Sequence, residues 1–347
     1  MKKLFAVLLA AVLLLTGAVF AQAEEEKVLN VFTWEGYLDE VTLAGFTEAT
    51  GIQVNISVFD SNDAMLMKLQ SNGGSDYDIV IASDYVLSAA RKEGLLLALD
   101  REKLTNWDNL NPQYLNQYFD PDNVYSVPYT VGSPMIVYDP EQVEGEITSF
   151  SDLWDPQFED SLWLLDDARV QLGAVLRSLG YSYNTTDEAQ LQEAAEKLNA
   201  IKPNVRVLNY DMSYDYFAAG EVKAAYMFTP FVYLTMLDNP NLVAVFPEEG
   251  IGFGIDSMVI PVNAPHPENA HAFLNYYLQA EVAKTVAESQ FYITPNQAAE
   301  ALLDPEYLAC APFNIPEDLL ATKEYVEDIG EAESLYQDIW TDFVLLQ

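Results

Sequence analysis

The strongest constraint on the fold is a series in which short apolar strands alternate with helices over the first hundred residues. Strand patterns at 29–33, 53–59 and 77–83 are separated by helical stretches at about 39–50 and 64–70. The last strand, YDIVIAS, is a continuous apolar run of the kind found in the centre of a parallel sheet. Parallel strands joined by helices need right-handed crossovers, so the series predicts a doubly wound α/β sheet. No G-x-G-x-x-G sequence follows these strands, which argues against a dinucleotide site.

A similar pattern restarts in the second part of the chain and predicts a second sheet. Its expected strands are SLWLLDD, VRVLN, VKAAYMF and LVAVFPE, with helices at 168–179, 188–201 and 230–237. A chain of 347 residues is also too long for one ordinary core. The chain is expected to cross between sheets near Val131 and Gly254. We therefore predict two lobes, residues 24–131 with 256–304 and residues 132–255 with 305–347.

The C-terminal third carries further expectations about local structure. One long helix is predicted from about Pro267 to Glu288, and a shorter one over 317–326. His266 and His271 flank the helix start in APHPENAH and are expected to be exposed. They lie five residues apart, so they do not share a helical face as zinc ligands would, and no metal site is predicted. Cys310, the single cysteine, is expected to be a small buried residue, and it allows no intramolecular disulfide.

The first 23 residues predict export. Two lysines, an apolar run and the small-residue pattern Ala21-Gln22-Ala23 form a signal peptide, with the mature chain beginning near Glu24. The apolar run is short for a membrane span. The box LTGA resembles a lipoprotein signal, but Ala18 stands where the lipidated cysteine would be. We therefore expect a periplasmic or extracellular protein that carries no lipid anchor.

The charge balance excludes one class of partner. The formal net charge is −38, from 16 basic and 54 acidic residues. So few cations cannot form the basic patch that nucleic acid requires. The negative field favours cationic ligands, although it is equally compatible with solubility alone or with a salty habitat.

Ligands of open parallel sheets bind beyond the carboxyl ends of the strands. Here the predicted strand ends carry aromatic and acidic residues: Trp34–Tyr37, Ser83–Tyr85, Asp166–Asp167 and Phe228. A protonated amine needs this mixture, because carboxylates accept its hydrogen bonds and ring faces attract its charge, by roughly 0.5–2 kcal/mol each. The strand ends therefore predict a site for a small cationic amine.

Asp256 is the sharpest candidate in this set. It precedes an apolar strand at the predicted crossing between lobes, which makes it the expected anchor of an ammonium group; the alternative is a structural cap. Asp166 and Asp167 precede a helix, so we expect one to cap it and the other to face the cleft. Arg169 is a candidate ion-pair partner of Asp166.

Catalysis is not expected. A serine hydrolase needs a histidine base, and no G-x-S-x-G sequence accompanies the two histidines. A remote alternative is a secreted hydrolase that uses Asp166, Asp167 or Asp256, although neighbouring positions do not fix the carboxylate separation that glycoside hydrolysis demands. No cofactor is predicted.

The motifs VFTWEGYL, YDIVIASDY, LLDDAR, DSMVIPVNA and YITPN, in this order, resemble the bacterial periplasmic spermidine/putrescine-binding proteins. The resemblance covers nearly the whole mature chain. It implies a type II periplasmic-binding-protein fold whose two lobes close on a polyamine. It also implies delivery by a monomer to the permease of an ABC transporter. An alternative ligand is another small cation, such as a quaternary or guanidino amine.

The resemblance places six residues in the ligand cleft: Trp34, Ser83, Tyr85, Asp167, Asp256 and Tyr292. Phe228 stands where the family usually has tryptophan. Gly36, Val170 and Gly254 replace two acids and an aromatic residue, while Asp84 is an acid at a usually neutral position. Glu35 or Asp84 is the expected substitute for a missing acid, and Phe253 for the missing ring. The predicted ligand-binding set is Trp34, Glu35, Tyr37, Ser83, Asp84, Tyr85, Asp167, Phe228, Phe253, Asp256 and Tyr292.

Overall fold

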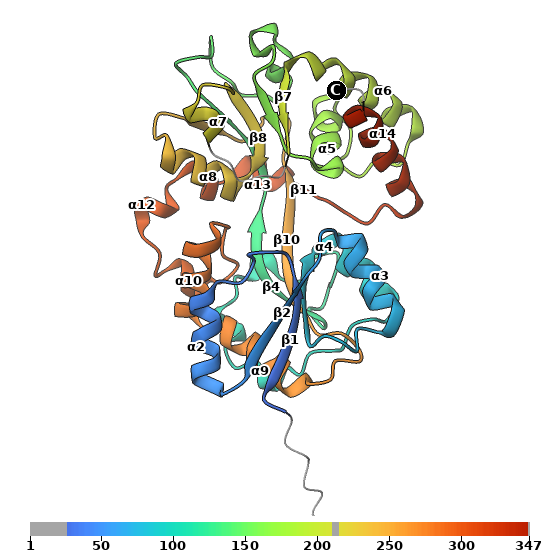
Figure 1. Ribbon diagram of the computed structural model, residues 1–347, viewed down its shortest axis with the longest axis vertical. Helices are drawn as coiled ribbons and strands as arrows, with labels where there is room; N and C mark the ends of the chain where they lie inside the picture. Colours follow the sequence, from blue (N-terminus) through green and yellow to red (C-terminus); the bar gives the residue numbers. More distant parts are fainter. Residues whose placement is uncertain (1–25, 210–214, 346–347) are drawn as a thin grey trace, which may run out of the picture.

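The computed structural model describes residues 26–209 and 215–345, so the predicted signal peptide at residues 1–23 lies outside it. The described chain forms two α/β lobes, one above the other along the long axis, each built on its own sheet (Figure 1). Long strands pass from the lower lobe toward the upper one. This architecture agrees with the predicted fold class.

The lower sheet mixes parallel and antiparallel pairs. Its strand order is β11-β10-β3-β1-β2, and β4 also pairs with β10. The parallel pairs β1–β2 and β1–β3 belong to the predicted β-α-β series, whereas β10 runs antiparallel to both β3 and β4. Its strands are β1 (Val28–Thr33), β2 (Gln53–Val58), β3 (Ile79–Ser83), β4 (Ser126–Gly132), β10 (Gly252–Val259) and β11 (Glu324–Tyr325).

The upper sheet has the order β7-β6-β8-β5-β9, with β6 parallel to β7 and β8, and β5 antiparallel to β8 and β9. The chain leaves the lower sheet at Gly132 and enters the upper one at Pro134. Ser133, between them, donates from Oγ to the carbonyl of Gly252 at 2.7 Å. The strands are β5 (Pro134–Tyr138), β6 (Leu162–Leu164), β7 (Val205–Leu208), β8 (Ala224–Phe228) and β9 (Val243–Val245).

Helices cover both faces of each sheet, as expected for doubly wound sheets (Figure 1). The helices of the lower lobe are α2 (Glu40–Thr50), α3 (Asn62–Asn72), α4 (Asp84–Lys92), α9 (Pro267–Tyr277), α10 (Ala280–Gln290) and α11 (Gln297–Glu300). Those of the upper lobe are α5 (Ala168–Ser178), α6 (Glu188–Ala200), α7 (Asp215–Ala218), α8 (Thr229–Asp238), α13 (Glu317–Thr322) and α14 (Glu333–Leu345). The short α12 (Pro305–Leu308) lies on the connection between the lobes.

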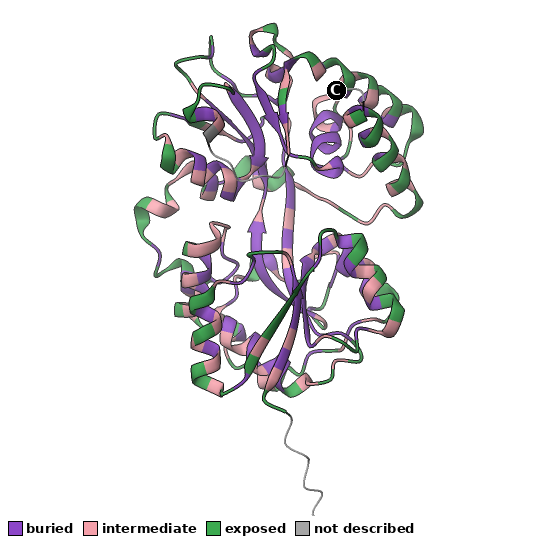
Figure 2. Cartoon of the chain, in the orientation of Figure 1, coloured by how far each residue is buried: buried purple, intermediate pink, exposed green. Residues whose placement is uncertain are grey.

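Each lobe has apolar packing on both sides of its sheet. Figure 2 shows the strands largely buried, apart from the exposed edge strand β2, and the outer faces of the helices exposed. In the lower lobe, Phe46 of α2 packs edge-on against Phe273 of α9, while Met65 and Leu69 of α3 fill the opposite side. In the upper lobe α14 packs on α5 and α6 through buried Trp340. None of the described helices is long and apolar enough to cross a membrane.

Two predicted helices are wrong in extent. The long helix over 267–288 is two helices, α9 and α10, separated at Leu278, whose carbonyl accepts hydrogen bonds from Asn109 and Asn296 side chains. The helix predicted over 317–326 ends at Thr322, because the next residues form β11 and pair in parallel with β10. Periodicity misses both features because their causes lie elsewhere in the chain. The asparagine side chains that bond Leu278 and the strand β10 that pairs with β11 are distant in sequence.

The predicted exposure of the two histidines and the predicted burial of the cysteine are also wrong. His271 is only 4% exposed: its Nε2 accepts from the Asp100 amide at 2.9 Å, and its Nδ1 bonds the Pro267 carbonyl. His266 is largely covered and contacts the Asp78 carboxylate at 3.1 Å. Cys310 is partly exposed and not buried.

Asp120 supports the start of β4 and allows a test of the fold. Its carboxylate is buried and accepts from three backbone amides, those of Val124, Tyr125 and Ser126, and from the Ser126 hydroxyl.

Asp120→Ala should therefore lower the free energy of unfolding by about 2–4 kcal/mol, because several buried donors lose their acceptor. Urea unfolding at neutral pH measures this change. Asp122→Ala, two residues away and exposed, is the matched control and should stay within about 0.5 kcal/mol of the parent; equal effects would contradict the assignment.

Candidate ligand-binding site

The turn after β1 gives the four residues of the WEGY sequence different degrees of burial. The Tyr37 amide donates to the Trp34 carbonyl at 3.4 Å, and Gly36 between them has a φ of 71°, a conformation that favours glycine. Tyr37 turns inward and is buried, while Glu35 at the tip is exposed. Trp34 is half-buried and packs edge-on against Phe59, with ring centroids 4.5 Å apart.

Asp256 of β10 is held by hydroxyl groups. The Tyr37 hydroxyl donates to Asp256 Oδ2 at 2.5 Å and also lies 2.6 Å from the hydroxyl oxygen of Thr130. Because the tyrosine has one proton to donate, Thr130 donates to Tyr37 and Tyr37 donates to the carboxylate. Ser83 also hydrogen-bonds to the Asp256 side chain. The carboxylate is therefore fixed by neutral donors, at a residue that is only half-buried.

Burial raises the pKa of Asp256 above its ordinary value, while the hydrogen bonds from Tyr37 and Ser83 lower it in part. Burial and the Asp256 charge raise the pKa of Tyr37 and of Tyr292, so both phenols stay protonated as donors. The ion pairs within residues 26–209 and 215–345 all lie elsewhere, and none includes Asp256. The site thus has a carboxylate that is costly to ionise and has no ion-pair partner in the described chain.

Asp84 lies directly behind this carboxylate. It is 1% exposed, and its two oxygens accept from the Tyr85 amide at 2.8 Å and the Ile255 amide at 3.3 Å. Burial, followed by the charge of Asp256, raises the pKa of Asp84 well above its ordinary value. Asp84 therefore ties the start of α4 to β10 beside Asp256. Asp84 is therefore not accessible to a ligand in this arrangement, whereas Glu35 is exposed.

Tyr85 marks the side of the site that faces the upper lobe. Its hydroxyl accepts from Asn62 Nδ2 at 2.9 Å, and the same amide donates to Ser83 Oγ at 3.2 Å. The Arg169 guanidinium of α5 lies 5.9 Å from the Tyr85 ring centroid. Burial and then the charge of Asp167 raise the pKa of Tyr85. The structure thus brings together Tyr85 and Asp167, which the sequence placed on different lobes.

The two aspartates before α5 have separate roles. Asp167 caps the helix by accepting from the Val170 amide at 3.0 Å, as expected for one of the pair. Asp166 is exposed and accepts from the Trp340 indole at 2.8 Å. The predicted pairing of Arg169 with Asp166 is wrong, because Arg169 pairs with Glu333 at 2.7 Å.

The aromatic candidates divide between the two faces of β10. Tyr292 stands edge-on to Tyr37, with centroids 6.0 Å apart, and so belongs to the Asp256 side. Phe253 is 1% exposed and packs edge-on against Tyr325 at 5.4 Å. Strand side chains alternate between faces, so Phe253 points away from Asp256. Phe253 therefore does not replace the ring absent at Gly254. Phe228 is half-buried at the end of β8.

Sequence reasoning missed Thr130 and Asn62, which hold Tyr37, Ser83 and Tyr85 in place. Thr130 lies directly opposite Asp256 in the antiparallel ladder. The only available signal for Thr130 was a polar residue within the apolar stretch SVPYTVG near the predicted crossing. Asn62 follows Ser61, which caps α3, and its own side chain is left to contact Ser83 and Tyr85.

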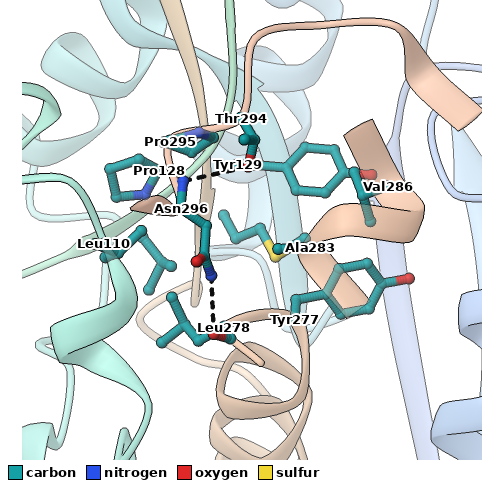
Figure 3. A pocket seen from close by; sticks show the side chains of 12 residues that line it. Leu110, Pro128, Tyr129, Tyr277, Leu278, Ala283, Val286, Thr294, Pro295 and Asn296 are labelled. Atoms are coloured by element: carbon teal, nitrogen blue, oxygen red, sulfur yellow. Dashed lines mark hydrogen bonds between the residues drawn. The ribbon is translucent and has the colours of Figure 1, made fainter. Parts of the chain in front are cut away.

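A small cavity lies in the lower lobe behind these residues (Figure 3). Its volume is about 20 Å³, enough for about one water molecule. Apolar and aromatic side chains, including Leu110, Tyr277 and Val286, line it together with Tyr129. The Tyr129 hydroxyl donates to the Tyr37 carbonyl at 2.7 Å. The cavity is therefore part of the packing that supports Tyr37 and is too small for an amine ligand.

Comparisons with known proteins agree with this architecture. The sequence model of the bacterial extracellular solute-binding protein family matches residues 42–309. The chain is 38% identical over 341 residues to the spermidine/putrescine-binding periplasmic protein of Salmonella typhimurium, covering 98% of both chains. It is 31% identical over 344 residues to the putrescine-binding periplasmic protein SpuD of Pseudomonas aeruginosa, covering 94% of this chain and 93% of that one.

A solved structure gives the same result. The spermidine/putrescine ABC transporter substrate-binding protein PotD from Streptococcus pneumoniae superposes with a TM-score of 0.81 at 36% identity, covering 92% of this chain and 99% of that one. A two-lobed solute-binding protein is thus the class that the fold defines. The chain belongs to the bacterial extracellular solute-binding protein family and, within it, to the group of periplasmic spermidine/putrescine-binding proteins.

The buried carboxyl of Asp84 predicts a specific pH dependence of stability. The pKa of Asp84 in the folded chain lies above the unfolded value of about 4. The contribution of this group to the free energy of unfolding is therefore fully present below about pH 4. The contribution is lost as the pH rises through the folded pKa. Asp84→Asn removes this loss, so the free energy of unfolding of the variant minus that of the parent should increase from pH 4 to pH 7. Urea unfolding at several pH values measures the difference, and a constant or falling difference would contradict the raised pKa.

Proposed function

We propose that this chain captures a small polyamine, putrescine or spermidine, for uptake by an ABC importer. The observation that carries the proposal is the half-buried Asp256 carboxylate, held by hydroxyl groups and with no ion-pair partner among the described residues. An ammonium supplies the missing positive charge and the charge-assisted hydrogen bonds that favour the ionised acid. The names of the relatives, which mention spermidine and putrescine, support this ligand class.

Aromatic residues are the proposed walls for the methylene chain and its charges. Tyr292 and Tyr37 stand beside Asp256, and Tyr85 is the partly buried ring nearest the upper lobe. Ring faces attract ammonium groups and also cover the alkyl chain between them. Asp167 is the proposed partner of a second ammonium, because its charge already acts on Tyr85.

Closure of the two lobes is the proposed mode of capture. We assign residues 24–131 with 256–304 to one lobe and 132–255 with 305–347 to the other. Asp256 and Tyr85 belong to the first lobe, and Asp167 and Phe228 to the second, so a ligand bound to both sets favours the closed arrangement. The ligand shifts the equilibrium only by the difference between its affinities for the two arrangements. The proposed partner is the permease of the transporter, reached by an exported monomer.

A different small cationic amine is the second candidate. The observation that favours it is Gly254, where a Cβ would meet no protein atom within 4 Å beside the anchor. Val170, where the family usually has an acid, is buried in the apolar packing around α5 and offers no carboxylate to the cleft. A quaternary or guanidino amine needs fewer terminal acids than spermidine does.

Neutralising the anchor tests the proposal. Asp256→Asn keeps the size of the side chain and removes its charge, so the binding free energy of putrescine and spermidine should weaken by about 2–5 kcal/mol. Titration calorimetry of the mature chain measures this at physiological ionic strength. Asp122→Asn removes an equal charge from an exposed position and should leave affinity unchanged. An Asp256→Asn affinity equal to that of the parent would remove Asp256 as the anchor.

A further inference from the structure

Two chains of hydrogen-bond donors end on the Asp256 carboxylate. In the first, Thr130 of β4 donates to the Tyr37 hydroxyl, and Tyr37 donates to Asp256. In the second, Asn62 Nδ2 donates to Ser83 Oγ at 3.2 Å, and Ser83 hydrogen-bonds to the Asp256 side chain. A hydroxyl group has a single proton, so a neighbour that donates to this hydroxyl leaves its proton for the carboxylate. Thr130 and Asn62 therefore begin the two chains.

The backbone fixes the direction of the Asn62 amide. The Ser83 amide nitrogen lies 3.5 Å from Asn62 Oδ1, and because a backbone N–H can only donate, this contact identifies the oxygen. Asn62 Nδ2 then faces two hydroxyl groups, Ser83 Oγ and the Tyr85 hydroxyl at 2.9 Å. One buried side chain at the start of α3 thus orients both a donor to the anchor and a proposed wall of the site.

The residues that begin the chains are shielded from solvent. Thr130 is 3% exposed and Asn62 is 8% exposed, and the Tyr37 ring between Thr130 and the anchor is also buried. Water therefore does not readily replace a donor that is removed from either chain. In such a low-dielectric setting consecutive hydrogen bonds polarise one another, so a donor at the start of a chain strengthens the bond at its end.

These hydrogen bonds act on the ionisation of the anchor in one direction. Burial raises the pKa of Asp256, and the hydrogen bonds from Tyr37 and Ser83 lower it in part. Burial likewise raises the pKa of Tyr37, and the hydrogen bond from Thr130 lowers it in part, which makes this phenol a stronger donor. The other titratable groups whose pKa values respond to the Asp256 charge are Asp84, Tyr129 and Tyr292.

We propose that Thr130 and Asn62 are positioning residues, which act through the hydroxyl groups between them and the anchor to keep the Asp256 carboxylate ionised for the ligand ammonium. This inference rests on the proposed function. Neither residue needs to touch the ligand. When the first donor of a chain is lost, the last donor holds the carboxylate less strongly, so a proton competes better with the ammonium. The expected consequence is a loss of affinity that grows as the pH falls.

Ligand titrations at two pH values test the inference on conservative variants. Thr130→Val keeps the shape of the side chain and removes its donor, and Asn62→Leu does the same for the second chain. Calorimetry with putrescine and spermidine gives the ratio of the Kd of each variant to that of the parent at pH 5 and at pH 8. The ratio should be about 2–10-fold larger at pH 5, the effect expected from one neutral hydrogen bond. Asp84 is present in parent and variants alike, so its own titration largely cancels in the ratio.

Two further variants show whether the hydroxyl group itself is responsible. Thr130→Ser retains the donor and should bring the ratios at the two pH values back together. Thr235→Val is the matched control, because it removes a buried hydroxyl group of α8 that donates to the Phe231 carbonyl, away from the anchor. Its ratio should stay near one at both pH values.

The outcomes separate this inference from the function on which it rests. A purely structural defect weakens binding alike at every pH, so an equal ratio at pH 5 and pH 8 overturns the role of the residue replaced. A serine variant that behaves like the valine variant overturns the role of the Thr130 hydroxyl. A parent chain that binds neither amine would instead overturn the proposed function. Circular dichroism confirms folding, and if Asn62→Leu does not fold, Asn62→Ala is judged by the same ratios.

Discussion

The constraint on which the rest of the site depends is a pair of neighbouring carboxyl groups, the half-buried Asp256 and the buried Asp84, neither of which forms an ion pair within the described residues. Among the described residues, the hydrogen-bond donors to Asp256 are neutral hydroxyl groups, and those to Asp84 are backbone amides. Such donors hold the oxygens in place but do not repay the desolvation of a full negative charge. The charge of Arg169 lowers the pKa of Asp84 only in part, and its guanidinium is paired with Glu333. We propose that a ligand ammonium is the group that balances this charge.

The same residues lie where the lobes meet, so the proposed anchor and the connection between the lobes share the same strands. Asp256 lies on β10 close to the point where this strand passes toward the upper lobe, and Thr130 lies opposite it on β4, which leads to the crossing at Ser133. The hydroxyl relay from Thr130 through Tyr37 therefore spans both crossing strands. In the proposed binding mode, a ligand held by Asp256 contacts the elements that connect the lobes.

Periodicity predicted much of the fold, and the apolar run YDIVIAS became the central strand β3. Asp256 was expected to precede an apolar strand at the crossing between the lobes, whereas the structure places it within β10. The helix break at Leu278 escaped prediction because distant asparagine side chains hold it open. Thr130 escaped because the β4–β10 register joins residues far apart in sequence. Phe253 was misplaced although strand alternation, a local rule, already puts it on the face opposite Asp256.

The central claim is that a ligand ammonium pairs with the Asp256 carboxylate, beside the buried carboxyl group of Asp84. It is tested most directly by calorimetric titration with a polyamine between pH 5 and pH 7 in buffers of different ionisation enthalpy, which counts the protons exchanged on binding. Alkylammonium groups keep their protons in this range, since they titrate near pH 10. The account predicts a net release of protons from the protein, because the bound cation lowers the raised pKa values of Asp256 and Asp84. Binding with a net uptake of protons by the protein would contradict it.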